Sequence, residues 1–413
     1  MNAAIVAIGS EMLGPTRVDT NSLKITAALE SYAVPLVRKS VVGDKLADLV
    51  AELRYVASRA ELLIVTGGLG PTEDDLTREA LCEAFGLALE VDESIVERIR
   101  SRFAARGWEM PEVNKRQANV FVGQTTLTNE RGTAPGFHLV ADGKDIWVFP
   151  GVPHELEWML ATYFTPWLAE QRGGRARFRR VVKIAGLTES GVEEKLQPYY
   201  EQHAGELVTI LASGGHIEIH LHADGVEDES RASLAARERE LVTIFGERIF
   251  GYDEDTLESV VGALLAQRGQ TLAVAESCTG GLLGSRITDV AGSSAYFMGG
   301  AICYTAAAKS DLAGVDPALI RAHGEVSEEV AVALARGIRE RFATTWGVGI
   351  TGIAGPTGGT PEKPVGTVHV AVAGPVEKHR KLLWQGPRTI IKWYSTQQAL
   401  DLLRRCILLV HAS

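Results

Sequence analysis

Cysteine is scarce in this chain, and long apolar runs are missing from it. The 413 residues include four cysteines, at positions 82, 278, 303 and 406, and no two of them form a CxxC pair. This spacing suggests neither a zinc site nor a disulfide framework, and free thiols are typical of a reducing compartment. No apolar stretch approaches the roughly 20 residues that cross a bilayer, and the first residues lack a basic region with a cleavage site. We expect a cytoplasmic protein with no membrane partner.

Basic residues are outnumbered by acidic ones. The chain has 42 lysines and arginines against 52 aspartates and glutamates, which gives a formal net charge of -10. An acidic chain repels nucleic acids unless a basic patch is segregated, and only residues 175–183 are locally basic. We therefore do not expect direct nucleic-acid binding. Hydrophobic residues make up 46% and charged residues 23%, which is ordinary for a globular protein of two or three domains.

Residues 1–170 alternate short β-rich runs with segments of helical periodicity. The apolar runs Ala3–Ile8 and Leu62–Val65 are typical of buried strands, and the second ends in a Thr-Gly-Gly turn. This alternation predicts parallel βαβ units in a doubly wound α/β domain. Ligands of such sheets bind at the carboxyl ends of the strands. The residues that we expect there are Glu11, Gly67, Gly68, Asp74 and Asp75.

Two further domains are expected after the first. Residues 171–180 are rich in arginine and glycine, and we interpret them as a linker that runs into a strand. Residues 178–251 predict a small α+β module in the order strand, helix, hairpin, helix, strand, with the hairpin turning at Gly214-Gly215. Residues 253–413 predict a compact α/β domain with a mixed sheet. Its expected strands are residues 272–275, 299–304, 347–351 and 367–373.

The third domain contains a serine in a setting that favours nucleophilic chemistry. The apolar run Leu272–Val274 precedes Ala275–Gly281, and apolar residues at helical spacing follow. This pattern predicts a strand, a tight turn and a helix start, where a hydroxyl lies among free backbone N–H groups at the positive end of the helix. Ser277 is the candidate nucleophile and Cys278 an alternative one. The simpler interpretation of Ser277 is a helix N-cap.

A serine nucleophile needs a base, and Lys309 is the candidate. It follows three alanines, Ala306 to Ala308, and Tyr304 precedes them. A lysine in apolar surroundings loses hydration, which lowers its pKa toward neutrality, and Tyr304 would orient the lysine or relay a proton. The alternatives are an exposed lysine at a helix start and an ordinary aromatic residue at a strand end.

Glycine-rich turns in the same domain suggest a phosphorylated substrate. Loops of this kind present backbone N–H groups to anions, and neighbouring hydroxyls and an arginine would add contacts. For the arginine, an exposed loop position is the alternative. The substrate contacts that we expect from these turns are Thr279, Gly280, Ser293, Ser294, Gly352, Gly355 and Arg388.

These segments resemble the CinA family along nearly the whole chain. In the C-terminal domain the matching residues are 275–281, 289–294, Tyr304 with Lys309, 323–327, 352–356 and 363–368. The resemblance implies a nicotinamide-nucleotide amidohydrolase, which converts nicotinamide mononucleotide to nicotinate mononucleotide and ammonia in pyridine nucleotide salvage, without a cofactor. It also implies that Ser277, Tyr304 and Lys309 form the catalytic group, and that Thr351 and Arg388 contact the substrate.

The N-terminal domain is similar to the molybdopterin-binding (MoaB/MogA-like) domain of this family. The match rests on residues 9–14, 19–21, 66–75, 132–136 and 150–153. It implies metal-dependent ADP-ribose pyrophosphatase activity at a nucleotide site that contains Gly67, Gly68, Asp74 and Asp75. Glycine loops can hold a pyrophosphate, and either aspartate can bind a divalent cation through oxygen. Alternatively, these carboxylates cap the helix after Pro71.

The middle module resembles the KH-like segment of the same family. It lacks the GXXG loop with which KH domains clamp nucleic acid, so we expect a structural connector. Three positions depart from the family pattern: Ala306 replaces a common asparagine, Pro387 replaces an aspartate before the arginine, and Phe121 replaces a proline. The first two bear on substrate positioning.

Two rival functions remain from the sequence. One is a protein that is mainly a metal-dependent nucleotide pyrophosphatase. The other is a non-catalytic pterin- or nucleotide-binding protein related to competence. Because the modules have exposed faces, we also expect a homodimer.

Overall fold

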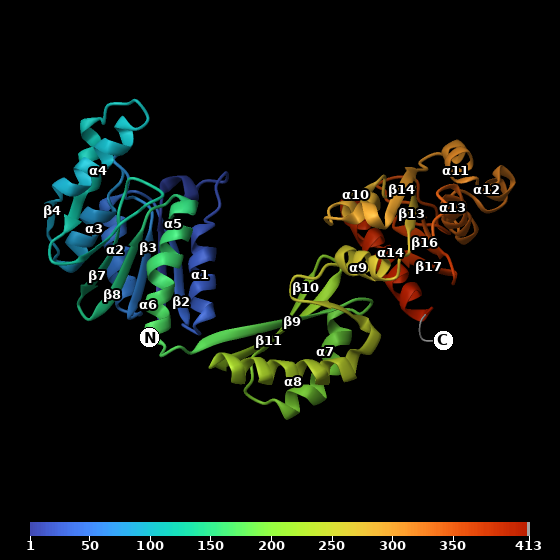
Figure 1. The fold of residues 1–413 in the computed structure, drawn as a ribbon, viewed down its shortest axis with the longest axis horizontal. Helices are drawn as coiled ribbons and strands as arrows, with labels where there is room; N and C mark the ends of the chain where they lie inside the picture. The colour runs from blue at the N-terminus through green and yellow to red at the C-terminus, as the bar shows by residue number, and fades with distance from the viewer. Residues whose placement is uncertain (411–413) are drawn as a thin grey trace. The chain divides into compact units, whose positions relative to one another are not determined.

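The computed structural model describes residues 1–410. These residues form two compact units, one of residues 1–178 with 223–232 and the other of residues 179–222 with 233–410 (Figure 1). Within residues 1–410, no helix has both the length and the apolar character needed to cross a membrane.

The N-terminal domain is a three-layer α/β/α structure, which confirms the predicted doubly wound fold. Its sheet has the order β2-β1-β3-β8-β7-β6, with parallel pairing from β2 to β8 and antiparallel pairing beyond. These strands are β2 (Leu36–Val42), β1 (Ala3–Ile8), β3 (Leu62–Thr66), β8 (Lys144–Phe149), β7 (Gly136–Ala141) and β6 (Thr125–Leu127).

Helices cover both faces of this sheet because both faces are apolar (Figure 1). Alternate residues of each central strand point to opposite layers, so Ala4 and Val6 pack on one side and Ala3 and Ile5 on the other. The first layer contains α2 (Leu46–Ala57), α3 (Thr77–Phe85) and α4 (Glu93–Ala104), and the second contains α1 (Asn21–Ser31), α5 (Pro153–Met159) and α6 (Thr165–Gln171).

The middle module has the predicted order of elements but a longer first strand. Its sheet has the order β10-β11-β9-β12. The predicted linker, residues 171–180, is wrong at its end, because residues 176–180 already belong to β9. Arg177 pairs with Asp224 at 2.7 Å and Arg180 pairs with Glu238 at 2.5 Å, so these arginines are held by carboxylates rather than solvated. The elements are β9 (Ala176–Ile184), α7 (Glu189–Gln202), β10 (Val208–Ser213), β11 (His216–Gly225), α8 (Glu227–Phe245) and β12 (Ile249–Tyr252).

The C-terminal domain has a mixed five-stranded sheet in the order β14-β13-β15-β16-β17. β13 is parallel to both of its neighbours, and β16 and β17 continue antiparallel. The strands are β14 (Phe297–Ile302), β13 (Leu272–Glu276), β15 (Trp346–Gly352), β16 (Thr367–Ala373) and β17 (Lys378–Leu383). The edge strand β17 was not predicted, because its basic sequence lacks a buried strand's apolar run.

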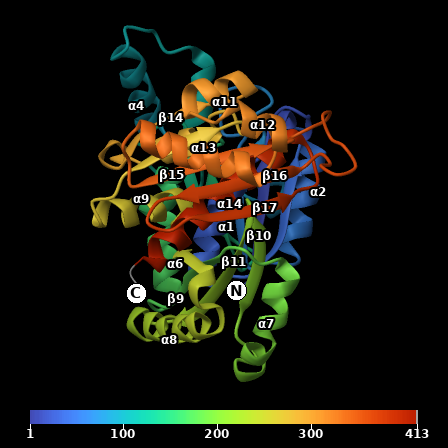
Figure 2. The same cartoon turned by 90° about the vertical axis from the view of Figure 1, so that its right-hand side faces the viewer.

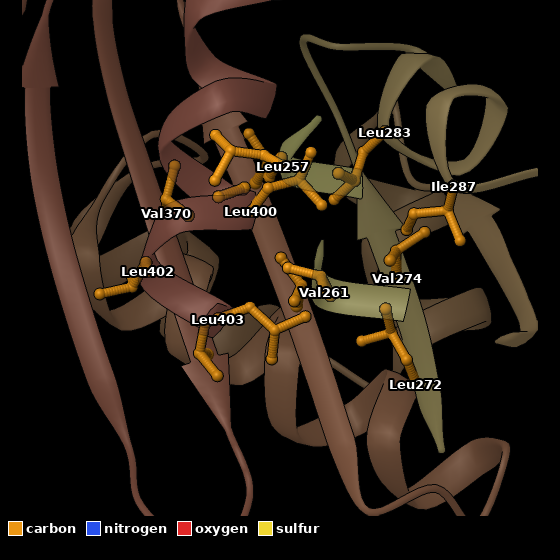
Figure 3. Close-up of a cluster of buried hydrophobic side chains, with 14 of the residues drawn as sticks. Leu257, Val261, Leu272, Val274, Leu283, Ile287, Val370, Leu400, Leu402 and Leu403 are labelled. Atoms are coloured by element: carbon orange, nitrogen blue, oxygen red, sulfur yellow. The ribbon is translucent and has the colours of Figure 1, made fainter. Parts of the chain in front are cut away.

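The two faces of this sheet differ in side-chain size. Large residues such as Leu272, Val274 and Val370 form one face and pack against α9 (Leu257–Gln267), α10 (Leu282–Thr288) and α14 (Arg388–Leu409) (Figure 3). On the other face α13 (Glu328–Arg341) lies across β15 and β16 (Figure 2). A Cβ atom on Gly347 or Gly349 would lie 2.1 or 2.3 Å from a carbonyl oxygen of α13. The helix therefore packs directly on the strand backbone, which only glycine permits.

The hairpin of the middle module packs on α14. The Gly214 carbonyl oxygen accepts hydrogen bonds from Trp393 Nε1 at 2.6 Å and from Gln397 Nε2 at 2.9 Å. Gly215 has a φ of +93°, and a Cβ atom there would lie 2.9 Å from Cδ1 of Tyr394. Because Arg388 begins the same helix, the hairpin rests on the element that also supplies a predicted substrate contact.

Two glycine substitutions separate this contact from backbone strain. Gly205 has a φ of +92°, almost the value at Gly215, but a Cβ atom there would meet nothing within 4 Å. We expect Gly205→Ala to cost about 1 kcal/mol of unfolding free energy through strain alone. Gly215→Ala should cost about 1–3 kcal/mol more, because the methyl group overpacks against Tyr394. Urea unfolding of the full chain measures both, and equal losses would contradict the docking of the hairpin.

Candidate active site

A cavity of about 340 Å³ lies at the carboxyl edge of the C-terminal sheet. Ser277 directly follows β13, Tyr304 follows β14, and Thr351 lies near the end of β15. β14, the next strand in sequence, pairs with one edge of β13, and β15 pairs with the other edge. The carboxyl end of β13 is therefore a topological switch point, which is where open α/β sheets bind ligands. The lining residues are Ser277, Cys278, Tyr304, Lys309, Glu325, Val326, Thr351, Gly352, Ile353, Ala354, Gly355, Thr357, Gly358 and Arg388.

Four of the expected substrate contacts do not line this cavity. Thr279 is fully buried, and Gly280 lies beyond it in the turn. Ser293 and Ser294 form a short 3-10 helix just before β14 begins at Phe297. They therefore lie at the amino edge of the sheet, a strand length of about 20 Å from its carboxyl edge. The structure therefore does not bring Ser293 and Ser294 to the cavity that Ser277 lines, because sequence proximity to the nucleophile loop does not fix the edge of the sheet.

The nucleophile loop, residues 277–281, is organised by the carboxylate that precedes it. Glu276 is buried, and its oxygens accept hydrogen bonds from the N–H groups of Gly281 at 3.1 Å, Leu283 at 3.0 Å and Gly284 at 2.8 Å. These are donors at the start of α10 that the helix itself cannot satisfy. Ser277 is thus not the cap of this helix; its hydroxyl is left to the cavity.

One N–H group of the loop remains as a candidate oxyanion donor at the cavity. The Ser277 N–H donates to Ile350 O at 2.9 Å, and that of Gly280 donates to Ser277 O at 3.1 Å. Within residues 1–410, the N–H groups of Cys278 and Thr279 have no hydrogen-bond acceptor. Thr279 is fully buried and does not line the cavity, so the set of oxyanion donors expected at the helix start is reduced to the N–H group of Cys278.

Lys309 lies on α11 (Ala306–Ala313) and is almost fully buried, with 1% of its side chain exposed. Contrary to the prediction from the sequence, the surroundings of Lys309 are not entirely apolar, because its Nζ lies 2.8 Å from Oε2 of Glu325. A buried ammonium is stabilised by such a partner. The resemblance already matched residues 323–327, but nothing in the sequence pairs Glu325 with a lysine 16 residues away, so its role was missed.

Tyr304 and Arg388 form a second pair in the cavity. Arg388 donates to the Tyr304 hydroxyl at 3.0 Å and to the Gly355 carbonyl oxygen at 2.8 Å. Lys309 contacts the backbone carbonyl of Tyr304 at 3.5 Å rather than its hydroxyl. The tyrosine hydroxyl therefore positions the arginine, not the lysine. Within residues 1–410, Arg388 pairs with no carboxylate, which leaves its charge for an anion.

Cys278 is a poor alternative nucleophile. The residue is buried, and burial raises the pKa of its thiol to about 12. Only the thiolate attacks efficiently, so Ser277 is the better nucleophile at neutral pH.

The N-terminal sheet has its own cavity of about 550 Å³ at the carboxyl ends of β1, β3 and β8. Gly67, Gly68, Asp74 and Asp75 line it as expected, together with Glu11, Asp44 and Glu155. A Cβ atom on Gly67 would lie 2.2 Å from the Ile8 carbonyl oxygen, so glycine is required where β3 passes β1. The lining is rich in carboxylates.

The two aspartates are not helix caps. Asp75 accepts a hydrogen bond from the N–H of Thr72 at 2.9 Å, and α3 begins at Thr77 without a side-chain cap. Within residues 1–410, no three His, Cys, Asp or Glu side chains cluster as a metal site. The pair suits a Mg²⁺-like ion, which commonly takes one or two carboxylates, waters and substrate phosphates.

Substitution of Glu276 tests the organisation of the nucleophile loop. Glu276→Gln keeps the size but turns an NH₂ group toward backbone donors. We expect a loss of about 1–3 kcal/mol in unfolding free energy and faster amide hydrogen exchange at Gly281, Leu283 and Gly284. Glu254→Gln, an exposed acid of the same domain, is the control and should change neither quantity. Unchanged exchange in Glu276→Gln would contradict the assignment.

Three family models together match most of the chain. The CinA C-terminal domain matches residues 254–407, a probable molybdopterin binding domain matches residues 4–170, and the damage-inducible protein CinA KH domain matches residues 179–251. The solved structure of the competence/damage inducible protein CihA from Agrobacterium tumefaciens is 35% identical, covering 37% of this chain and 93% of its own with a TM-score of 0.36.

Full-length relatives extend this match. The CinA-like protein of Solibacter usitatus is 44% identical over 411 residues, which cover 98% of each chain. A putative competence-damage inducible protein of Moorella thermoacetica is 45% identical over 417 residues, covering 98% of this chain and 99% of its own. With this identity along nearly its whole length, and with a MoaB-like domain, a KH-like connector and a CinA C-terminal domain in that order, the chain belongs to the CinA family.

Proposed function

We propose that the C-terminal domain hydrolyses the carboxamide of nicotinamide mononucleotide to nicotinate mononucleotide and ammonia. The observation that carries this proposal is one cavity lined by Ser277, Lys309 and Arg388. Amide hydrolysis through a covalent intermediate needs a nucleophile and a base, and a nucleotide substrate needs a cationic contact for its phosphate. The cavity supplies all three.

The first step is the deprotonation of the Lys309 ammonium group. Transfer of a proton from Lys309 Nζ to Glu325 across 2.8 Å gives a neutral amine beside a carboxylic acid. The amine then takes the hydroxyl proton of Ser277 as its oxygen attacks the carboxamide carbon. Glu325 is half exposed, so it also connects the buried amine with solvent.

The remaining steps restore the resting state. The N–H group of Cys278 stabilises the oxyanion, an effect worth about 3–4 kcal/mol. When the tetrahedral intermediate collapses, the C–N bond breaks, and Lys309 returns its proton to the leaving nitrogen, which departs as ammonia. Water then attacks the acyl-serine ester and gives a proton to Lys309. As the ester bond breaks, Lys309 passes this proton to the Ser277 oxygen, and nicotinate mononucleotide leaves. Glu325 then returns its proton to Lys309, which restores the ion pair. Arg388 holds the phosphate, which positions the amide for attack.

Removal of the nucleophile should abolish ammonia release. We expect Ser277→Ala to lower kcat at least 1,000-fold while nicotinamide mononucleotide still binds, because the phosphate contact at Arg388 is kept. Cys278→Ala is the matched control from the adjacent position, and its activity should stay within a few-fold of the wild type. An ammonia-release assay with the full chain measures both. Equal turnover by Ser277→Ala and the wild type would end the proposed mechanism.

Glu325 should act on the base rather than on binding. Glu325→Gln leaves the buried lysine without a proton acceptor or counter charge, so kcat should fall about 10- to 100-fold, with little change in KM. The pH profile of kcat should also shift, and Glu325→Asp should restore part of the rate. A variant with the wild-type rate and profile would assign Glu325 a purely structural role.

We also propose, as a second activity, that the N-terminal domain cleaves the pyrophosphate of ADP-ribose. The observation that favours it is a cavity of about 550 Å³ where glycine loops meet carboxylates. Asp74 and Asp75 would hold a divalent cation, whose charge offsets that of the pyrophosphate. Gly67 and Gly68 allow the backbone to approach the ligand closely.

The two proposed activities should separate by mutation. Asp74→Asn should abolish Mg²⁺-dependent release of AMP from ADP-ribose, because one of the two carboxylates proposed to hold the cation is lost, while ammonia release is unchanged. Ser277→Ala should show the reverse pattern. If wild-type protein with Mg²⁺ releases no AMP, the N-terminal cavity is a binding site without this chemistry, as in a pterin- or nucleotide-binding protein.

A further inference from the structure

Two histidines meet on neighbouring strands of the C-terminal sheet. His369 lies on β16 and His379 lies on the edge strand β17, and Nδ1 of His369 is 2.9 Å from Nε2 of His379. His379 is paired with Ala371 in the strand register, and Ala371 follows His369 by two residues. Both imidazoles therefore lie on the face of the sheet that α13 covers (Figure 2). We call them the histidine pair, and neither of them lines the candidate active site.

The facing nitrogens of the histidine pair share a single hydrogen. The ring planes are within 16° of each other, and the ring centroids are 5.1 Å apart, so the two nitrogens approach each other more closely than the ring centres do. A neutral imidazole has a hydrogen on one nitrogen and a lone pair on the other. Nδ1 of His379 lies 3.2 Å from Oε2 of Glu328 and directs its hydrogen toward that carboxylate. Nε2 of His379 therefore presents a lone pair to His369.

Burial keeps both rings neutral at neutral pH. It lowers the pKa of His369 to about 4, and the positive charges of His379 and Lys381 act in the same direction. Burial also lowers the pKa of His379. Neutral imidazole is the commonest metal ligand in proteins, so the histidine pair is in the protonation state that binds a cation.

Acidic side chains at the start of α13 support such a cation. Metal-binding histidines usually donate their other ring N–H to a carboxylate, which fixes the tautomer and makes the ring a stronger ligand. Glu328 takes that place on His379, and the negative charge of Glu329 also reaches both rings. These two acids offset the positive charges of Lys363 and Lys381. The Glu328 side chain is 62% exposed, and β17 is an edge strand, so an ion has a path from solvent.

We propose that the histidine pair binds a divalent transition-metal ion of the Zn²⁺ class, with Nδ1 of His369 and Nε2 of His379 as its two protein ligands. The hydrogen of His369 moves from Nδ1 to Nε2, which gives the ion a lone pair from each ring. Water completes the coordination, because within residues 1–410 no three His, Cys, Asp or Glu side chains are placed to hold one ion. The inference concerns binding alone and rests on neither proposed activity.

The geometry of the pair is close to that of a zinc site. Two Zn–N bonds of about 2.0–2.1 Å at a tetrahedral angle place their nitrogens roughly 3.3 Å apart. The nitrogens of the histidine pair are 2.9 Å apart, so they need to separate by only about 0.4 Å. Imidazole suits Zn²⁺, Cu²⁺ and Ni²⁺, whereas Mg²⁺ prefers oxygen ligands.

Calorimetric titration of the full chain with ZnCl2 tests the inference. Excess MgCl2 is present throughout, because Mg²⁺ occupies carboxylate sites without competing for imidazole. We expect the wild type to bind Zn²⁺ and its melting temperature to rise with the Zn²⁺ concentration, since an ion that binds only the folded chain stabilises it. Bound Cu²⁺ should show superhyperfine coupling to two imidazole nitrogens in electron paramagnetic resonance spectra.

Variants assign the binding to the pair, because thiols and other histidines are the same in each of them. His369→Gln and His379→Gln should each weaken Zn²⁺ binding at least 10-fold and remove most of the rise in melting temperature. Glu328→Gln should weaken it about 10-fold, the low end of the usual range for such carboxylates, because Glu328 is largely exposed. His220→Gln is the control, since His220 also lies on a strand beside a carboxylate, Glu218 at 2.9 Å, and it should bind Zn²⁺ as the wild type does.

Two results would overturn the inference. One is the absence of Zn²⁺ binding by the wild type in excess MgCl2. The other is undiminished Zn²⁺ binding by a His369→Gln, His379→Gln double variant whose melting temperature in EDTA equals that of the wild type. If the double variant melts at a lower temperature in EDTA, His379→Gln alone decides, because a substitution on the edge strand disturbs the core least.

Discussion

A single buried carboxylate organises the C-terminal site. Glu276 ends β13 and accepts hydrogen bonds from three N–H groups at the start of α10. It thereby joins strand to helix through a tight glycine turn and satisfies donors that Ser277 would otherwise cap. Because these donors are taken, the serine hydroxyl faces the cavity, and within residues 277–281 the N–H group of Cys278 remains for an oxyanion.

The packing of α13 on β15 fixes the strand that lies beside the nucleophile loop, residues 277–281. The small face of the sheet lets α13 approach the backbone of β15 at Gly347 and Gly349, and β15 in turn receives the hydrogen bond from Ser277 N–H. The segment before α13 carries Glu325, which reaches Lys309. One helix thus positions both the strand beside the nucleophile and the partner of the base.

The two cavities occupy the same position in their sheets but have linings of opposite charge. Each lies where parallel strands end at a switch point of its sheet. The C-terminal cavity presents Lys309 and Arg388, which suits a phosphate without a metal. The N-terminal cavity presents the carboxylates of Glu11, Asp44, Asp74, Asp75 and Glu155, which repel an anion and suit a cation. A shared architecture therefore does not imply shared chemistry, because the loops set the charge.

The sequence by itself determined most helix and strand positions, because backbone propensity and apolar periodicity are local properties of the chain. It also determined that a serine follows β13 and that glycine turns follow several strands. Only the tertiary structure decided which side chains meet. It placed Ser293 and Ser294 at the far edge of the sheet, paired Lys309 with Glu325 and Tyr304 with Arg388, buried Cys278, and extended β9 into the expected linker. Such contacts depend on how strands pair and helices pack, and residue spacing along the chain does not contain that information.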